Sequence, residues 1–101
     1  MSQVAVVVKL KIKEGQRDAM TEAVKPGIET AKGEVGTRFY AFHHDAVEPN
    51  TVWLYELYAD QDAANLHMGS EAFKSWSKTL ASFVDGAPEF SFLTPIGGKG
   101  I

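Results

Sequence analysis

Two neighbouring segments of this sequence are apolar on both of the faces that a β-strand presents. Residues 37–44 and 51–59 are rich in aromatic and β-branched side chains, and the Asp, Pro and Asn between them are common turn formers. The two segments therefore predict a β-hairpin. One of its faces would carry Tyr40, Phe42, Val52, Leu54 and Tyr58, and the other Phe39, Ala41, Trp53, Tyr55 and Leu57. Both faces therefore need to be buried against other parts of a protein.

The rest of the chain alternates between the two-residue period of strands and the 3.6-residue period of helices. Residues 4–12 predict a strand, and residues 16–32 predict a helix with a kink or a second half-helix at Pro26. Asp60 and Ser70 are candidate N-caps, the first for a short helix ending near Gly69 and the second for a helix with an apolar stripe. Residues 89–94 predict a last strand. The order β-α-β-β-α-β predicts an α+β, ferredoxin-like antiparallel sheet with helices on one face.

This fold leaves the second face of the hairpin uncovered. With 101 residues the chain has room for one hydrophobic core, so we expect a single domain over residues 1–96 and a flexible, glycine-rich tail over 97–101. Pairing two such sheets face to face would bury both apolar faces in a closed barrel with the helices outside. The sequence thus predicts a homodimer, a dimeric α+β barrel, with a higher oligomer also open. The alternative is a monomer whose own loops cover the face.

Composition narrows the classes of partner. A net charge of −3 and an isoelectric point near 5.5 disfavour nucleic acid and anionic membranes, which bind clustered Lys and Arg. No apolar run approaches the roughly 20 residues that span a bilayer, and the apolar N-terminal run alternates with lysines, as a strand does and a signal peptide does not. Because the chain lacks cysteine, it has no disulfide or thiolate metal site. We expect a cytoplasmic protein with a small-molecule ligand.

Glu56 is the most unusual candidate for chemistry, because it is a carboxylate in the middle of an apolar strand. If His44 lies opposite Val52, then Tyr40 lies directly across from Glu56 with Arg38 on a diagonal, although the register could slip by two residues. A buried carboxylate without partners is costly and has a raised pKa. Two interpretations follow: a cross-strand ion pair with Arg38, or a carboxylate that orients or activates a substrate.

Two further side chains are candidates for the same site. His67 shares the side of its helix with Ala63, which should face the sheet, where an imidazole could exchange a proton near neutral pH or be merely hydrogen-bonded. Tyr40 could donate a hydrogen bond to a ligand or serve packing alone. The adjacent His43 and His44 point to opposite faces of a strand, which disfavours a shared metal ion. Three apolar side chains of the last helix are expected in the core: Phe73, Trp76 and Leu80.

Three segments, EVGTRFYAFHHD, NTVWLYELYAD and QDAANLHMGSEAF, resemble the antibiotic biosynthesis monooxygenase family, in particular its small quinol-monooxygenase-like members. The motif residues that match are Glu34, Gly36, Tyr40, Tyr55, Glu56, Tyr58, Asp60, Ala63, His67, Ser70 and Phe73. The chain departs from many relatives at Ala72, where they have a histidine. It also lacks the Asn in the first strand that haem-degrading relatives use.

The resemblance implies the dimeric barrel fold, a pocket between sheet and helices, and oxidation of phenols or dihydroquinones by O₂ without a cofactor or metal. Within it, we expect His67 to accept a proton and Tyr40 and Glu56 to orient the substrate oxygen or the imidazole. The fold also resembles autoinducer-processing isomerases, which move protons on a phosphorylated sugar-like ketone. A third hypothesis, a non-catalytic binding or stress-associated dimer, is consistent with Ala72.

Overall fold

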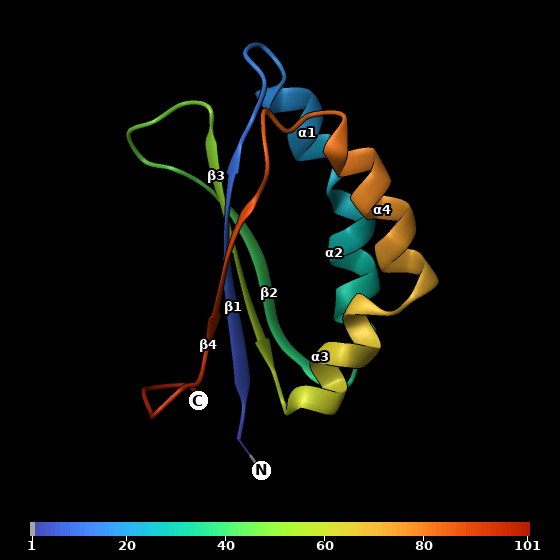
Figure 1. Cartoon of the computed structure of the whole chain (residues 1–101), viewed down its shortest axis with the longest axis vertical. Helices are drawn as coiled ribbons and strands as arrows, with labels where there is room; N and C mark the ends of the chain where they lie inside the picture. Colours follow the sequence, from blue (N-terminus) through green and yellow to red (C-terminus); the bar gives the residue numbers. More distant parts are fainter. Residues whose placement is uncertain (1) are drawn as a thin grey trace.

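The computed structural model describes residues 2–101 as one antiparallel sheet with helices on a single face (Figure 1). The strands are β1 (Val4–Lys11), β2 (Thr37–His44), β3 (Thr51–Tyr58) and β4 (Glu89–Leu93), in the sheet order β2-β3-β1-β4. The helices are α1 (Arg17–Ala23), α2 (Lys25–Lys32), α3 (Gln61–Met68) and α4 (Glu71–Ala81). The predicted α+β, ferredoxin-like fold is therefore confirmed.

The break between α1 and α2 follows from Pro26, as the sequence predicts. Val24 is the C-cap of α1, and α2 begins at the next residue, which places Pro26 in the first turn of the second helix. A proline is tolerated there because the amide hydrogens of a first turn have no partner inside the helix. Both halves bury their apolar stripe, with Met20, Val24 and Ala31 each less than 5% exposed.

The two predicted N-caps hold the helices that border the site. The Asp60 carboxylate accepts from the Ala63 amide at 2.8 Å, and the Ser70 hydroxyl oxygen accepts from the Phe73 amide at 3.1 Å. Such caps typically stabilise a helix by about 1 kcal/mol. They also fix where α3 and α4 begin. At the junction of the two helices His67 and Phe73 lie close together, with their ring centroids 5.4 Å apart.

The core lies between the sheet and the helices. Alternate residues of β1 face it, and Val6, Val8 and Leu10 are at most 2% exposed. Met20 from α1 and Tyr58 from β3 complete its centre. None of the helices formed by residues 2–101 is long and apolar enough to cross a membrane.

The helix-free face of the sheet is apolar but unevenly covered. Phe39 is 45% exposed and packs against Tyr55, whereas Leu57 is only 3% exposed. The last three residues of the chain, 99–101, turn to this side (Figure 1) and line a surface hollow with Tyr55 and Leu57. The predicted mobility of residues 97–101 stays a prediction.

Candidate active site

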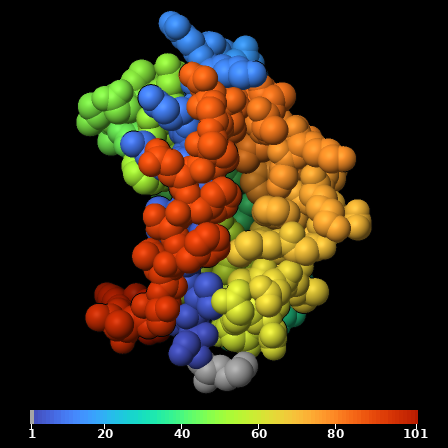
Figure 2. All heavy atoms as spheres, viewed as in Figure 1, coloured from blue at the N-terminus to red at the C-terminus, as the bar shows by residue number. Residues whose placement is uncertain are grey.

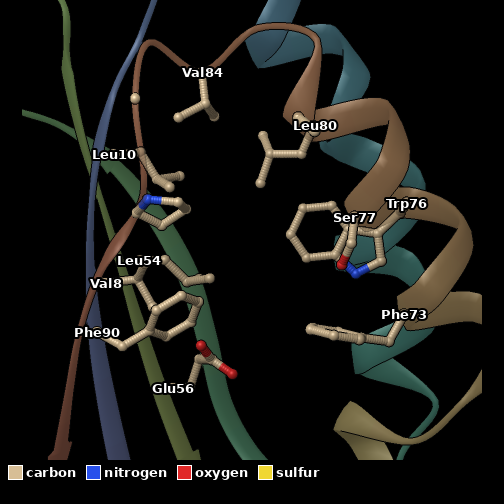
Figure 3. A pocket seen from close by; sticks show the side chains of 13 residues that line it. Val8, Leu10, Leu54, Glu56, Phe73, Trp76, Ser77, Leu80, Val84 and Phe90 are labelled. Carbon is tan, nitrogen blue, oxygen red and sulfur yellow. The ribbon is translucent and has the colours of Figure 1, made fainter.

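A largely apolar cavity of about 220 Å³ lies between the sheet and α4, and in the space-filling view a hollow separates β4 from α4 (Figure 2). Its sheet side is formed by Val8, Leu10 and Leu54, and its helix side by Phe73, Trp76 and Leu80 (Figure 3). The sequence predicts these three α4 side chains in the core. Trp76 and Leu80 do pack against the core, whereas Phe73 packs against the rings of His67 and Trp76. All three remain half-buried because α4 covers the cavity as well as the core.

Glu56 is the one ionisable side chain that lines this cavity within residues 2–101, and Figure 3 shows its carboxylate projecting from the sheet towards the helix side. It is 4% exposed and accepts a hydrogen bond from the Tyr58 hydroxyl. Burial raises the pKa of Glu56, and the Tyr58 hydrogen bond and the nearby His67 oppose this rise. A carboxylate whose pKa lies closer to neutrality is suited to accept a proton from a bound ligand.

The predicted hairpin register is confirmed, because His44 lies opposite Val52 and Tyr40 opposite Glu56. Of the two interpretations of Glu56, the ion pair with Arg38 is wrong. The ladder between β2 and β3 is irregular between Thr37 and Phe39, so Arg38 leaves the register, and its side chain is exposed. In the part of the chain that the structure describes, no Lys or Arg pairs with Glu56.

Tyr40 packs against His67 and does not line the cavity. Its hydroxyl group is buried and has no hydrogen-bond partner among residues 2–101. Burial, with the charges of Glu56 and Glu34, raises the pKa of Tyr40, and the same burial with Glu56 raises the pKa of Tyr58. Both phenols therefore keep their protons at neutral pH. The Tyr58 hydroxyl donates its hydrogen to Glu56, whereas the Tyr40 hydroxyl has no acceptor among residues 2–101.

His67 faces the sheet, as the sequence predicts, and is 3% exposed. Its Nδ1 lies 2.6 Å from Oε1 of Glu34, and its buried Nε2 has no partner in the described chain. The His67 ring lies 5.2 Å from that of Tyr40 and 5.5 Å from that of Tyr58. His67 does not itself line the cavity, so the structure brings the three predicted residues into one cluster but exposes only Glu56 to the cavity.

Sequence reasoning did not assign a role in the cluster to Glu34 or to Tyr58. Glu34 reaches His67 because the chain passes very close to α3 at Gly36, where an added Cβ would lie 2.5 Å from the Cβ of Ala63. The signal for this contact was the Glu34–Gly36 pair of the family motif. Tyr58 shares the helix-facing side of β3 with Glu56, two residues away. The alternation pattern and the family motif both contain Tyr58, but neither assigns it a hydrogen bond to Glu56.

His43 and His44 lie outside the cluster. His44 is exposed and its Nε2 lies 2.9 Å from the Thr21 hydroxyl oxygen. Within residues 2–101, no group of three or more His, Asp or Glu side chains has an arrangement that could hold a metal ion.

The fold and the cavity place the protein among α+β, ferredoxin-like domains with a pocket between sheet and helices. Its sequence matches the family described as antibiotic biosynthesis monooxygenase over residues 3–79. The chain therefore belongs to the antibiotic biosynthesis monooxygenase family. This membership supports a monooxygenase-like oxidoreductase activity in general.

Solved structures confirm the fold. A proposed antibiotic biosynthesis monooxygenase from Nitrosomonas europaea is similar with a TM-score of 0.90 and 20% identity, over 98% of this chain and 95% of that one. A Mycobacterium tuberculosis protein has a TM-score of 0.88 and 21% identity, over 98% and 100%. One from Caulobacter crescentus has a TM-score of 0.88 and 23% identity, over 95% and 92%. No curated protein matches this chain at a significant level.

Proposed function

We propose that this protein oxidises a small phenol or dihydroquinone with O₂ in the cavity beside α4, without a cofactor. The observation that carries the proposal is a buried carboxylate, Glu56, at an otherwise apolar cavity. An aromatic ring would pack among Leu54, Phe73 and Trp76, and its hydroxyl group would reach the carboxylate. Family membership supports the class of reaction.

The size of the cavity supports a small substrate. An apolar cavity of about 150 Å³ can hold benzene, and this one has about 220 Å³. One ring with a few substituents fits that space, whereas pockets for drug-sized ligands typically have about 300–1,000 Å³. We therefore expect a substrate with one ring or two fused rings.

The chemistry uses the electrons of the substrate itself. When the cluster accepts the hydroxyl proton, the anion can transfer one electron to O₂, and the two radicals combine at a ring carbon. The resulting peroxide anion takes back the proton to give a hydroperoxide, which loses water, so that a dihydroquinone and O₂ give a hydroxyquinone and water. The protein has to bind, deprotonate and shield the substrate.

We assign separate roles to the three candidate residues. Glu56 contacts the substrate hydroxyl, because it alone of the three lines the cavity. His67 does not line the cavity, but it takes up the proton, since its unpartnered Nε2 is buried in the same cluster as Glu56. Tyr40 donates a hydrogen bond from its free hydroxyl to the substrate oxygen or to the imidazole.

We also propose that the protein acts as a homodimer through the helix-free face of its sheet. Phe39 and Tyr55 form an aromatic pair on that face, and Phe39 is 45% exposed. Members of this family commonly form dimers. Sedimentation at micromolar concentration tests the proposal, and a stable single subunit would contradict it.

Oxygen consumption on mixing with dihydroquinones and phenols of one or two rings tests the function. We expect wild-type protein to consume O₂ faster than the buffer does, and Glu56→Gln to lower that rate by about a hundredfold, the scale of a lost general base. His67→Ala should also abolish turnover. Glu29→Gln makes the same chemical change on an exposed side chain of α2 and should leave the rate unchanged.

Two results would contradict the proposal. The first is an unchanged rate in Glu56→Gln. The second is tight binding of these compounds without O₂ uptake, which would favour an isomerase or a binding protein.

A further inference from the structure

The buried cluster borders two separate hollows. Glu56 lines the cavity beside α4, whereas the Glu34–His67 pair lies at another part of the surface. Both residues line a surface hollow of about 360 Å³ between α3 and residues 33–37, and neither lines the cavity of Glu56. Glu34 is 22% exposed, whereas His67 is 3% exposed. Glu34 is thus in partial contact with water, whereas His67, its partner, faces the buried cluster.

The geometry of the pair determines which nitrogen of His67 carries a proton. Oε1 of Glu34 lies 2.6 Å from Nδ1 of His67 and also accepts from the Thr37 hydroxyl group at 2.9 Å. A carboxylate can only accept, so Nδ1 must carry the hydrogen of this contact. In neutral His67 the lone pair is then on Nε2, which is buried and has no partner among residues 2–101.

The groups that surround His67 make this nitrogen a suitable proton acceptor. Tyr40 on β2 and Glu56 and Tyr58 on β3 face it from the sheet, and Glu34 faces it from the segment before β2. On α4 the contact is Phe73, which carries no charge. A proton taken up at Nε2 gives an imidazolium with a carboxylate on each side, Glu34 outside and Glu56 inside.

We propose that Glu34 is a positioning residue, which holds His67 with Nδ1 protonated and Nε2 free and stabilises the imidazolium that forms during turnover. This inference rests on the proposed function, in which His67 takes up the substrate proton and later returns it to the peroxide. Glu34 does not touch the substrate. Loss of its charge should therefore change the chemical step and leave substrate binding almost unaltered.

The test compares Glu34→Gln with wild type, using Glu71→Gln as the control because Glu71 is 93% exposed. We expect Glu34→Gln to lower kcat at least about tenfold, with KM changed less than about twofold. The acidic limb of the kcat–pH profile should move to lower pH, because removal of a negative charge favours loss of the stored proton. A role in folding alone would lower the melting temperature without moving that limb.

A second measurement does not depend on turnover. Nitrogen-15 NMR of the ligand-free protein at neutral pH should show His67 with Nδ1 protonated and Nε2 bare, and Glu34→Gln should populate the other tautomer. Wild-type protein with Nε2 protonated, or a tautomer unchanged in Glu34→Gln, overturns the inference even if the enzyme is active. An inactive wild type with the expected NMR result overturns the proposed function but leaves the pairing in place.

Discussion

At the scale of single residues, Glu56 is the side chain that joins the apolar cavity to the buried polar cluster. Glu56 stands out because it interrupts an apolar strand, and its position opposite Tyr40 follows from the hairpin register. Its actual hydrogen-bond donor is Tyr58, on the same strand. The expected partner, Arg38, is displaced by an irregularity in the ladder, which depends on the path of the backbone after Gly36 and has no clear pattern in the sequence.

The raised pKa of Glu56 predicts how stability depends on pH. Burial raises the pKa in the folded state above the unfolded value. The folded protein therefore binds more protons than the unfolded chain between those two pKa values, and this contribution to stability is lost as the pH rises through the folded value. Glu56→Gln removes this ionisable group, so its melting temperature relative to wild type should rise as the pH increases from the unfolded pKa to the folded pKa of Glu56.

Thermal unfolding followed by circular dichroism at intervals of one pH unit would measure this trend. Replacing the carboxylate that accepts from the Tyr58 hydroxyl with an amide oxygen shifts the melting temperature of the variant by an amount that is nearly independent of pH. The slope of the difference against pH is therefore the informative quantity. A difference that stays constant or falls across this range would show that the folded state does not raise the pKa of Glu56.

At the scale of elements, most of the fold could be predicted from periodicity and caps. Strand β2 occupies the predicted residues 37–44, and a break near Pro26 divides the first helical segment into two helices as expected. The cap at Asp60 begins α3, and the cap at Ser70 separates α3 from α4. These features depend on local chemistry. How closely two elements approach depends on contacts between distant residues, and here one glycine sets that distance.

Gly36 is the glycine that allows this close approach, because its Cα faces α3. A Cβ at this position would lie 2.5 Å from the Cβ of Ala63, so Gly36→Ala has to push the two segments apart. Overpacking of this kind typically costs about 1–3 kcal/mol. We expect a loss of that size in chemical denaturation, together with weakened contact between Glu34 and His67.

Gly33→Ala provides the matched control in the same segment. A Cβ at Gly33 would lie 3.5 Å from the Thr30 carbonyl oxygen, which is ordinary contact. Equal stability of the two variants would contradict the idea that close approach at Gly36 positions the pair.

At the scale of the whole molecule, the family resemblance implied a pocket between sheet and helices, but the residue pattern alone could not disclose which side chains line it. Phe73, Trp76 and Leu80 form an apolar stripe that suits a packed core and a cavity roof equally well. Which of the two forms depends on how far α4 stands from the sheet. In this fold Val84, Gly86 and Pro88, between α4 and β4, line the cavity too, so the return of the chain to β4 helps to set its width.

We propose that a phenolic ring binds in this cavity with its hydroxyl group on Glu56. A crystal structure of the protein soaked with a single-ring dihydroquinone in the absence of O₂, which prevents turnover, tests this binding mode. We expect the ring between Leu54 and Phe73, with one hydroxyl oxygen within hydrogen-bond distance of the Glu56 carboxylate. A saturating soak that leaves the cavity without the compound, or that places it on the helix-free face of the sheet, would contradict this binding mode.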